Sequence, residues 1–209
     1  MKKQGLFITF DGIDGCGKST QARLLARALK QMGYAVLLTR EPGGTKLGNR
    51  LRRFLLHPDS KVCPEAELFL YLADRAQHVQ EVIAPALAKG KVVISERFAD
   101  STIAYQGAGR GLPHKQIKEL NKFAVGDVMP NITILLDISP AAARNRMMND
   151  GEPADRFEKL AQSFHQRLAK EYRRLAAEES QRIRRIRAAG SSQQVHENIM
   201  EILIRIIHK

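Results

Sequence analysis

Short apolar runs alternate along the chain with longer segments in which apolar residues recur every three or four positions. Short runs rich in Val, Ile, Leu and Phe are typical of buried strands, and the longer spacing is typical of amphipathic helices. The strand-like segments are residues 6–10, 35–38, 92–94, 132–136 and 182–186. The helix-like segments are residues 21–32, 47–56, 64–88, 114–125, 141–148, 157–179 and 195–207.

This alternation predicts an α/β fold in which a parallel sheet is covered by helices on both faces. Ligands of such folds bind beyond the carboxyl ends of the strands. We expect residues 100–111 to form a mixed loop, because three glycines fall close together within it. The sequence has no internal repeat, low-complexity tract or linker, so we expect one domain over residues 1–209.

The composition is that of a folded globular protein. Hydrophobic residues make up 44% and charged residues 27% of the 209 positions, which excludes disorder for the bulk of the chain. No apolar run approaches the roughly 20 residues of a membrane-spanning helix, so we expect no membrane partner. The apolar stretch after the basic N-terminus is too short for a signal-peptide core, which favours a cytoplasmic protein. Cys16 and Cys63 fit no metal or disulfide pattern.

The chain has a large excess of positive charge. Its 34 Lys and Arg residues exceed its 22 Asp and Glu residues, giving a net charge of +12. Such a surplus favours anionic partners, which include nucleic acid, a membrane surface and phosphorylated small molecules. One hypothesis is therefore a nucleic-acid-binding NTPase or adaptor. No basic motif interleaved with aromatic residues supports it, so we expect no nucleic-acid partner.

One segment carries a specific chemical signal. Residues 12–19 (GIDGCGKS) match the phosphate-loop pattern G-x-x-x-x-G-K-[ST] and lie between a predicted strand and a predicted helix. Glycines let successive backbone N–H groups turn toward phosphate oxygens, and the helix N-terminus adds a positive dipole end. Lys18 is expected to reach the outer phosphates of a nucleoside triphosphate, and Ser19 to bind Mg²⁺. The predicted triphosphate-binding residues are Gly12, Ile13, Asp14, Gly15, Cys16, Gly17, Lys18, Ser19 and Thr20.

The acceptor of the γ-phosphate distinguishes two enzyme classes. A guanine-specific switch NTPase carries an Asn-Lys-x-Asp motif, and the nearest match, residues 121–124 (NKFA), lacks the aspartate. A kinase needs a second phosphate-binding site, for which arginine is suited because it binds phosphate through two hydrogen bonds. The pattern favours a kinase, because four arginines follow predicted strands or lie on the helices after them: Arg40, Arg52, Arg75 and Arg97.

Several segments together resemble the thymidylate kinase family in its bacterial form. Residues 10–20 (FDGIDGCGKST) look like its phosphate loop, and residues 39–45 (TREPGGT) are similar to its most specific signature. Residues 96–98 (ERF) resemble its Asp-Arg-aromatic motif and are followed by residues 101–107 (STIAYQG). Residues 155–158 (DRFE) resemble the end of its lid. These matches run in the family's order, so the resemblance covers essentially the whole chain.

The resemblance implies a P-loop NTPase fold of three layers, α/β/α, with a central parallel five-stranded sheet and a short helical lid at about residues 140–157. It implies a dTMP kinase, an enzyme that transfers the γ-phosphate of ATP to dTMP and yields dTDP and ADP for dTTP synthesis. The implied partners are ATP, dTMP and Mg²⁺, together with a second copy of the chain, since family members are typically homodimers. A P-loop kinase for another nucleoside monophosphate is the alternative hypothesis.

Carried over by position, the resemblance also assigns residues to the dTMP site. Arg97 and Arg40 would hold the monophosphate, and Asp14 would face the sugar 3′-hydroxyl. Arg75 would hydrogen-bond to the thymine edge, and Tyr71, one helical turn earlier, would stack on the ring. The residues assigned to dTMP in this way are Asp14, Arg40, Arg52, Tyr71, Arg75, Arg97, Ser101, Thr102, Tyr105 and Gln106.

The catalytic residues are expected to neutralise charge on the transferring phosphoryl group. Lys18 and Arg97 would act from one side of it. The family takes a further arginine either from the phosphate loop or from the lid, and the phosphate loop of this chain contains none. The resemblance therefore implies that the lid supplies it, and we expect Arg146 and Arg156 to do so.

Two residues are the expected Mg²⁺ ligands, Ser19 and Glu96. Glu96 stands where the family usually has aspartate, so its side chain is one methylene longer. Asp11, Asp14 and Asp137 are alternative carboxylates for this role.

Overall fold

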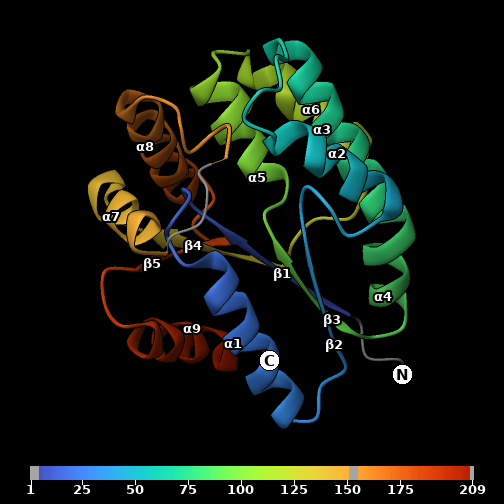
Figure 1. The fold of residues 1–209 in the computed structure, drawn as a ribbon. Helices are drawn as coiled ribbons and strands as arrows, with labels where there is room; N and C mark the ends of the chain where they lie inside the picture. Colours follow the sequence, from blue (N-terminus) through green and yellow to red (C-terminus); the bar gives the residue numbers. More distant parts are fainter. Residues whose placement is uncertain (1–4, 151–154, 208–209) are drawn as a thin grey trace.

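A computed structural model describes residues 5–150 and 155–207 of the chain. The described strands form one sheet in which every neighbouring pair is parallel, in the order β2-β3-β1-β4-β5 (Figure 1). The strands are β1 (Leu6–Asp11), β2 (Val36–Arg40), β3 (Val92–Glu96), β4 (Ile132–Asp137) and β5 (Ile183–Arg187). The first strand of the chain therefore lies at the centre of the sheet, and the residues that follow β1 emerge at the middle of its carboxyl edge.

Helices cover both faces of this sheet. Helices α1 and α9 pack together on one face, and α4 and α8 pack on the other (Figure 1). None of the helices within the described ranges combines the length and the apolar character that a bilayer crossing requires. The helical elements are α1 (Lys18–Gln31), α2 (Lys46–Leu56), α3 (Pro64–His78), η1 (Val79–Ile83), α4 (Ala84–Ala88), α5 (Ala99–Thr102), η2 (Ile103–Gly109), α6 (His114–Val125), α7 (Pro140–Asp150), α8 (Gln162–Glu178) and α9 (Ser192–Ile207), of which η1 and η2 are π-helical.

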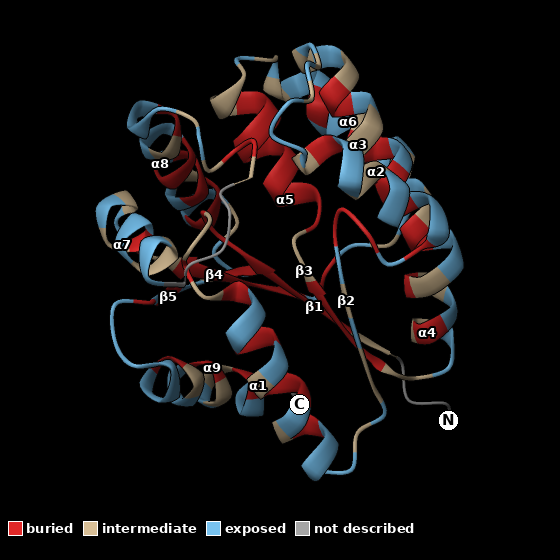
Figure 2. Ribbon diagram, in the orientation of Figure 1, coloured by how far each residue is buried: buried red, intermediate tan, exposed pale blue. Residues whose placement is uncertain are grey.

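The core lies between the sheet and its two helical layers. Strands β1, β3 and β4 are buried almost throughout, as Figure 2 shows, and their sequences are nearly continuous apolar runs. A parallel strand needs such a run because both of its faces are covered. The predicted α/β fold with a central parallel sheet of five strands is confirmed.

Two sequence predictions about local structure are wrong. Residues 99–109 are helical and do not form a loop. Gly107 and Gly109 are there because neighbouring side chains pack closely against this helical segment. A Cβ added at these positions would lie 2.7 Å from His114 and 2.6 Å from Phe164. The helix predicted from residue 157 begins only at Gln162. The Asp155 side chain accepts hydrogen bonds from the backbone N–H groups of residues 157 and 158, which stabilises a turn there.

Close packing also places a glycine inside α2. A Cβ on Gly48 would lie 2.5 Å from the Gly43 carbonyl oxygen and would collide with the Asp74 carboxylate, which accepts a hydrogen bond from the Gly43 N–H at 2.9 Å. Gly48 therefore lets α2 approach both α3 and the loop that follows β2.

We predict that Gly48→Ala lowers the free energy of unfolding by about 1–3 kcal/mol, because overpacking outweighs the better helix propensity of alanine. Urea unfolding followed by circular dichroism measures the change. Arg53→Ala, at an exposed position of the same helix, serves as the control and is expected to change the free energy by less than about 0.5 kcal/mol. A Gly48→Ala protein as stable as the wild type would contradict this packing.

Candidate active site

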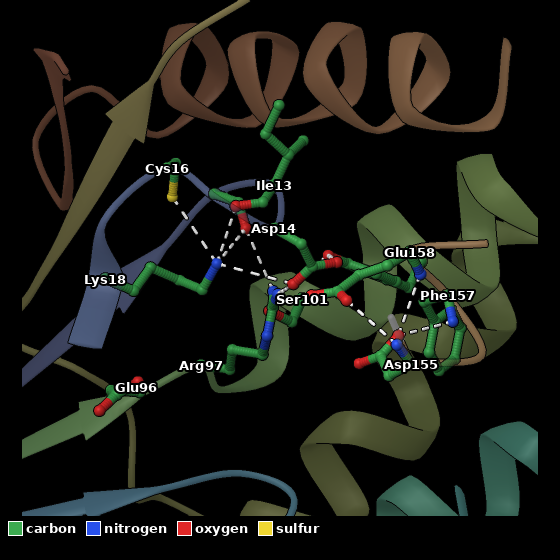
Figure 3. Close-up of polar contacts among 12 residues, drawn as sticks. Ile13, Asp14, Cys16, Lys18, Glu96, Arg97, Ser101, Asp155, Phe157 and Glu158 are labelled. Carbon is green, nitrogen blue, oxygen red and sulfur yellow. Dashed lines mark hydrogen bonds and ion pairs between the residues drawn. The ribbon is translucent and has the colours of Figure 1, made fainter. Parts of the chain in front are cut away.

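The loop between β1 and α1 has the shape of a phosphate-binding loop. Gly12 and Gly15 have φ angles of 138° and 72°, and a Cβ at either position would lie within 2.7 Å of a backbone oxygen. Only glycine fits these two positions. The Lys18 side chain extends over the loop, and its ammonium group donates hydrogen bonds to the carbonyls of Gly12 and Ile13, at 3.1 and 2.8 Å (Figure 3).

Arg97, directly after β3, joins this loop to the helices beyond it. Its φ angle of 68° makes it the one non-glycine residue with positive φ in the described ranges, and this conformation turns the chain at the end of β3. Its guanidinium forms an ion pair with Asp14 and donates to the Gly12 carbonyl at 3.1 Å and to the Tyr105 hydroxyl at 2.9 Å. Longer hydrogen bonds reach Ser101 at 3.3 Å and Tyr172 at 3.4 Å.

Asp14 is ionised at any physiological pH. Burial alone would raise its pKa, but the charges of Arg97 and Lys18 outweigh burial and lower the pKa to about 2. The Tyr105 hydroxyl donates a hydrogen bond of 2.7 Å to the other carboxylate oxygen. Figure 3 shows Lys18 and Arg97 both directed at this carboxylate. The positive charges that would meet a phosphate are thus held in place before any phosphate binds.

Two cavities meet at Arg97. The larger, of about 1620 Å³, is bounded by the phosphate loop, by α7 and by the residues that follow β5. The smaller, of about 80 Å³, lies between α3 and η2. The side chains that line both cavities are those of Asp14, Glu41, Arg52, Arg97 and Asp155. A molecule in the smaller cavity would therefore face a molecule in the larger one across these side chains.

The structure brings most of the predicted acceptor residues together. The smaller cavity is lined by Tyr71, Arg75, Ser101, Thr102, Tyr105 and Gln106. Arg52 borders both cavities, and its Nη1 donates to the Pro42 carbonyl at 3.1 Å. Arg40 lines only the larger cavity and is exposed.

Arg75 is the largest fully buried side chain and is almost saturated with partners. Its Nε donates to Glu41 at 2.8 Å, and its Nη1 donates to Thr102 at 2.7 Å and to Asn121 at 2.6 Å. Its Nη2 donates to the Phe98 carbonyl at 3.0 Å. A guanidinium has five N–H donors, so these four contacts leave one Nη2 hydrogen unused.

The predicted metal ligands lie side by side at the edge of the larger cavity. The Ser19 hydroxyl donates to Glu96 Oε2 at 2.5 Å. A hydroxyl and a carboxylate are hard oxygen donors of the kind that Mg²⁺ prefers, so these residues fit the metal. Residues 5–150 and 155–207 contain no group of three or more His, Cys, Asp or Glu side chains arranged to hold a metal by themselves.

The two predicted lid arginines lie in different places. Arg146, on α7, lines the larger cavity, and its Nη2 donates to the carbonyls of Ala188 and Gly190 at 2.8 and 3.4 Å. Arg156 lines neither cavity, and its guanidinium is directed at Glu67 and at the Leu55 carbonyl. Part of the predicted lid, residues 151–154, lies outside the described residues.

Sequence reasoning missed several residues of the site. Glu41 binds both Arg75 and His78, and it lies in the 39–45 segment, of which only Arg40 is a predicted site residue. Tyr172 comes from α8, far away in the sequence, and no local pattern marks it. Asp155 and Phe157 belong to the 155–158 motif, but nothing in the sequence indicates that they line the smaller cavity.

Together, a phosphate loop at the centre of a parallel sheet and a second, arginine-lined cavity beside it define a P-loop kinase. The family model described as thymidylate kinase matches residues 10–199. A thymidylate kinase of Synechococcus sp. (strain JA-3-3Ab) is 50% identical over 95% of both chains, and one of Pelotomaculum thermopropionicum is 44% identical over 95% of this chain and 92% of its own. The crystal structure of thymidylate kinase from Ehrlichia chaffeensis superposes with a TM-score of 0.78 at 34% identity, covering 95% of this chain and 98% of that one. The chain belongs to the thymidylate kinase family.

A second buried carboxylate, that of Asp11, makes the stability of the protein depend on pH. Burial and the charge of Asp100 raise the pKa of Asp11 to about 7, against the opposing effect of its hydrogen bond with Ser101. The folded protein therefore binds more protons than the unfolded chain between about pH 4 and pH 7. The contribution of Asp11 to the free energy of unfolding therefore falls as the pH rises through that window.

We predict that Asp11→Asn removes this contribution. The stability of the variant relative to the wild type should improve by about 1–3 kcal/mol between pH 5 and pH 8, because the amide does not ionise. Urea unfolding at the two pH values measures it. Asp127→Asn, at an exposed position, is the control and should show no such trend. An Asp11→Asn protein whose relative stability is the same at both pH values would contradict the assigned pKa.

Proposed function

We propose that this chain catalyses the reaction of its family, the transfer of the γ-phosphate of ATP to dTMP to give dTDP and ADP, with ATP in the larger cavity and dTMP in the smaller one. The observation that carries this proposal is the position of Arg97. Its guanidinium lies in the wall common to both cavities and touches the phosphate loop on one side and the acceptor pocket on the other. One side chain can therefore bind both the acceptor phosphate and the phosphoryl group that is being transferred.

The acceptor site fits a deoxynucleoside monophosphate. Arg40, Arg52 and Arg97 hold its phosphate at the junction of the two cavities. The free Nη2 hydrogen of Arg75 donates to a carbonyl oxygen on the pyrimidine edge, and Tyr71 stacks on the ring. The remaining polar residues of this wall, which bind the base and the sugar, are Asp14, Ser101, Thr102, Tyr105 and Gln106.

The donor site consists of the phosphate loop, residues 12–20. Its backbone N–H groups cradle the phosphates, and Lys18 exchanges its two carbonyl partners for the β- and γ-phosphate oxygens. Ser19 and Glu96 would hold Mg²⁺, and the bound ion would neutralise phosphate charge. Arg146, on α7, adds a positive charge to the donor site, and its guanidinium is held by the backbone that follows β5.

The reaction needs no general base. A monophosphate is largely a dianion at neutral pH, so its oxygen attacks the γ-phosphorus without losing a proton first. The bond between the γ-phosphorus and the bridging oxygen breaks, and ADP takes the electron pair. What the protein supplies is in-line positioning and positive charge around the transferring group, from Lys18 and Arg97.

We further propose a single domain over residues 1–209, with a lid at about residues 140–157, that forms a homodimer. Phe69 on α3 and Phe123 on α6 support the dimer, because these large apolar side chains are 58% and 90% exposed.

We predict that Arg97→Ala lowers kcat/KM for dTMP by at least about 100-fold, since it removes a charge aimed at the transition state. A coupled ADP-release assay with ATP and Mg²⁺ measures this, with dTMP compared against the other monophosphates and against no acceptor. Arg27→Ala, on the exposed face of α1, is the control and should match the wild type. Hydrolysis independent of an acceptor, or a preference for another base, would contradict the proposal.

A further inference from the structure

Arg156 is held by contacts that point away from the phosphates. Its Nε donates to the Leu55 carbonyl at 2.8 Å, its backbone N–H donates to the Leu56 carbonyl at 3.2 Å, and its Nη2 lies 2.8 Å from Glu67 Oε2. The side chain is 10% exposed. These contacts attach the segment after residue 154 to the end of α2 and to the start of α3.

Glu67 is the carboxylate that receives these contacts, and it is completely buried. It accepts hydrogen bonds from Gln106 at 2.8 Å and from Arg110 at 3.2 and 3.0 Å, besides its ion pair with Arg156. A buried carboxylate without such partners would be strongly destabilising, so these partners and Glu67 depend on one another. Gln106 is a wall residue of the smaller cavity, which makes Glu67 the support behind that wall.

Phe157 is the residue that this arrangement puts in place. Its ring is buried and lies under the guanidinium groups of Arg156 and Arg110, at 4.6 and 5.3 Å from the ring centre. On its other sides it meets Tyr105 edge-on at 5.5 Å and Tyr71 at 6.4 Å. Phe157 lines the smaller cavity together with Asp155, whose carboxylate accepts from the Phe157 N–H at 2.7 Å (Figure 3).

We propose that Arg156 and Glu67 are positioning residues of the acceptor site, and that they act by fixing Phe157 as an aromatic wall against the bound nucleotide. Arg156 works from behind this wall. Its guanidinium lines neither cavity, so its contribution is to binding of the monophosphate through Phe157 and not to the chemical step. The proposal rests on the function proposed above, because it takes dTMP as the ligand of the smaller cavity.

The test is binding of dTMP in the absence of ATP, measured by isothermal titration calorimetry on the full chain. Arg156→Lys keeps the charge beside Glu67 but loses the fixed fork of donors, and Phe157→Leu keeps an apolar side chain but loses the ring. Each single variant is expected to weaken dTMP binding about 10-fold. Because the arginine acts through the ring, the double variant should also weaken it about 10-fold, instead of the roughly 100-fold expected for independent effects.

Further variants and measurements separate this role from others. Arg144→Lys changes an exposed lid arginine that lines only the larger cavity, and dTMP affinity should stay within about two-fold of the wild type. Circular dichroism melts show whether each variant is folded. Glu67→Gln changes the other side chain of the ion pair between Arg156 and Glu67. In steady-state kinetics the Arg156→Lys protein should show a raised KM for dTMP with kcat and the KM for ATP little changed.

Unchanged dTMP affinity in a folded Arg156→Lys protein, with a large loss of kcat, would overturn the proposal and return Arg156 to the transferring phosphate. A roughly 100-fold loss in the double variant would overturn the route through Phe157. A wild-type protein that does not bind dTMP would overturn the proposed function itself, which distinguishes the two failures.

Discussion

The ion pair between Arg97 and Asp14 is the interaction on which the rest of the site depends. The two side chains are 16% and 17% exposed, and each comes from a turn directly after a central strand. Removing either partner would leave a charge with little access to water, which is more costly than the pair itself is stabilising. Because Arg97 also reaches helices η2 and α8 through tyrosine hydroxyls, the pair fixes the phosphate loop relative to the acceptor pocket.

Buried ion pairs between arginine and a carboxylate also occur at three other places in the described residues. Arg75 is paired with Glu41, Arg156 with Glu67, and Arg182 with Asp100. In each case a carboxylate at most 5% exposed fixes one or more arginines in a defined orientation. Arginine suits this purpose because its planar fork loses little freedom for each hydrogen bond that it forms. Of the arginines in these three pairs, Arg75 lines the smaller cavity, whereas Arg156 and Arg182 line neither cavity.

Much of the fold followed from the sequence, because the signals that fix it are local. The strands of a buried parallel sheet are nearly continuous apolar runs, and the phosphate loop needs glycines at set positions next to Lys18. The predictions of local structure were wrong where a residue is determined by contacts with residues outside its own segment. Gly107 and Gly109 looked like loop residues, yet they are helical because His114 and Phe164 pack against them. The turn at residues 157 and 158 depends on the Asp155 side chain, which competes with the helix for backbone N–H groups.

For the site, the sequence could indicate residue types but not their directions. Arg156 and Arg146 were equivalent as lid arginines in the sequence, yet one guanidinium is directed at Glu67 and the other at the backbone after β5. Glu67 and Asn121 could not be assigned to the site, because a single polar residue on a helix has no pattern. Their partners come from segments far away in the sequence, and only the folded chain brings them together.

The claim that one ion pair joins the two halves of the site can be tested by a double-mutant cycle on kcat/KM for dTMP, with Asp14→Asn, Arg97→Lys and the double variant. If the two side chains act as a unit, the double variant should be little worse than the worse single one, with a coupling free energy of about 1.5 kcal/mol or more. Losses that simply add, to within about 0.5 kcal/mol, would show that Asp14 and Arg97 contribute independently and would contradict the account.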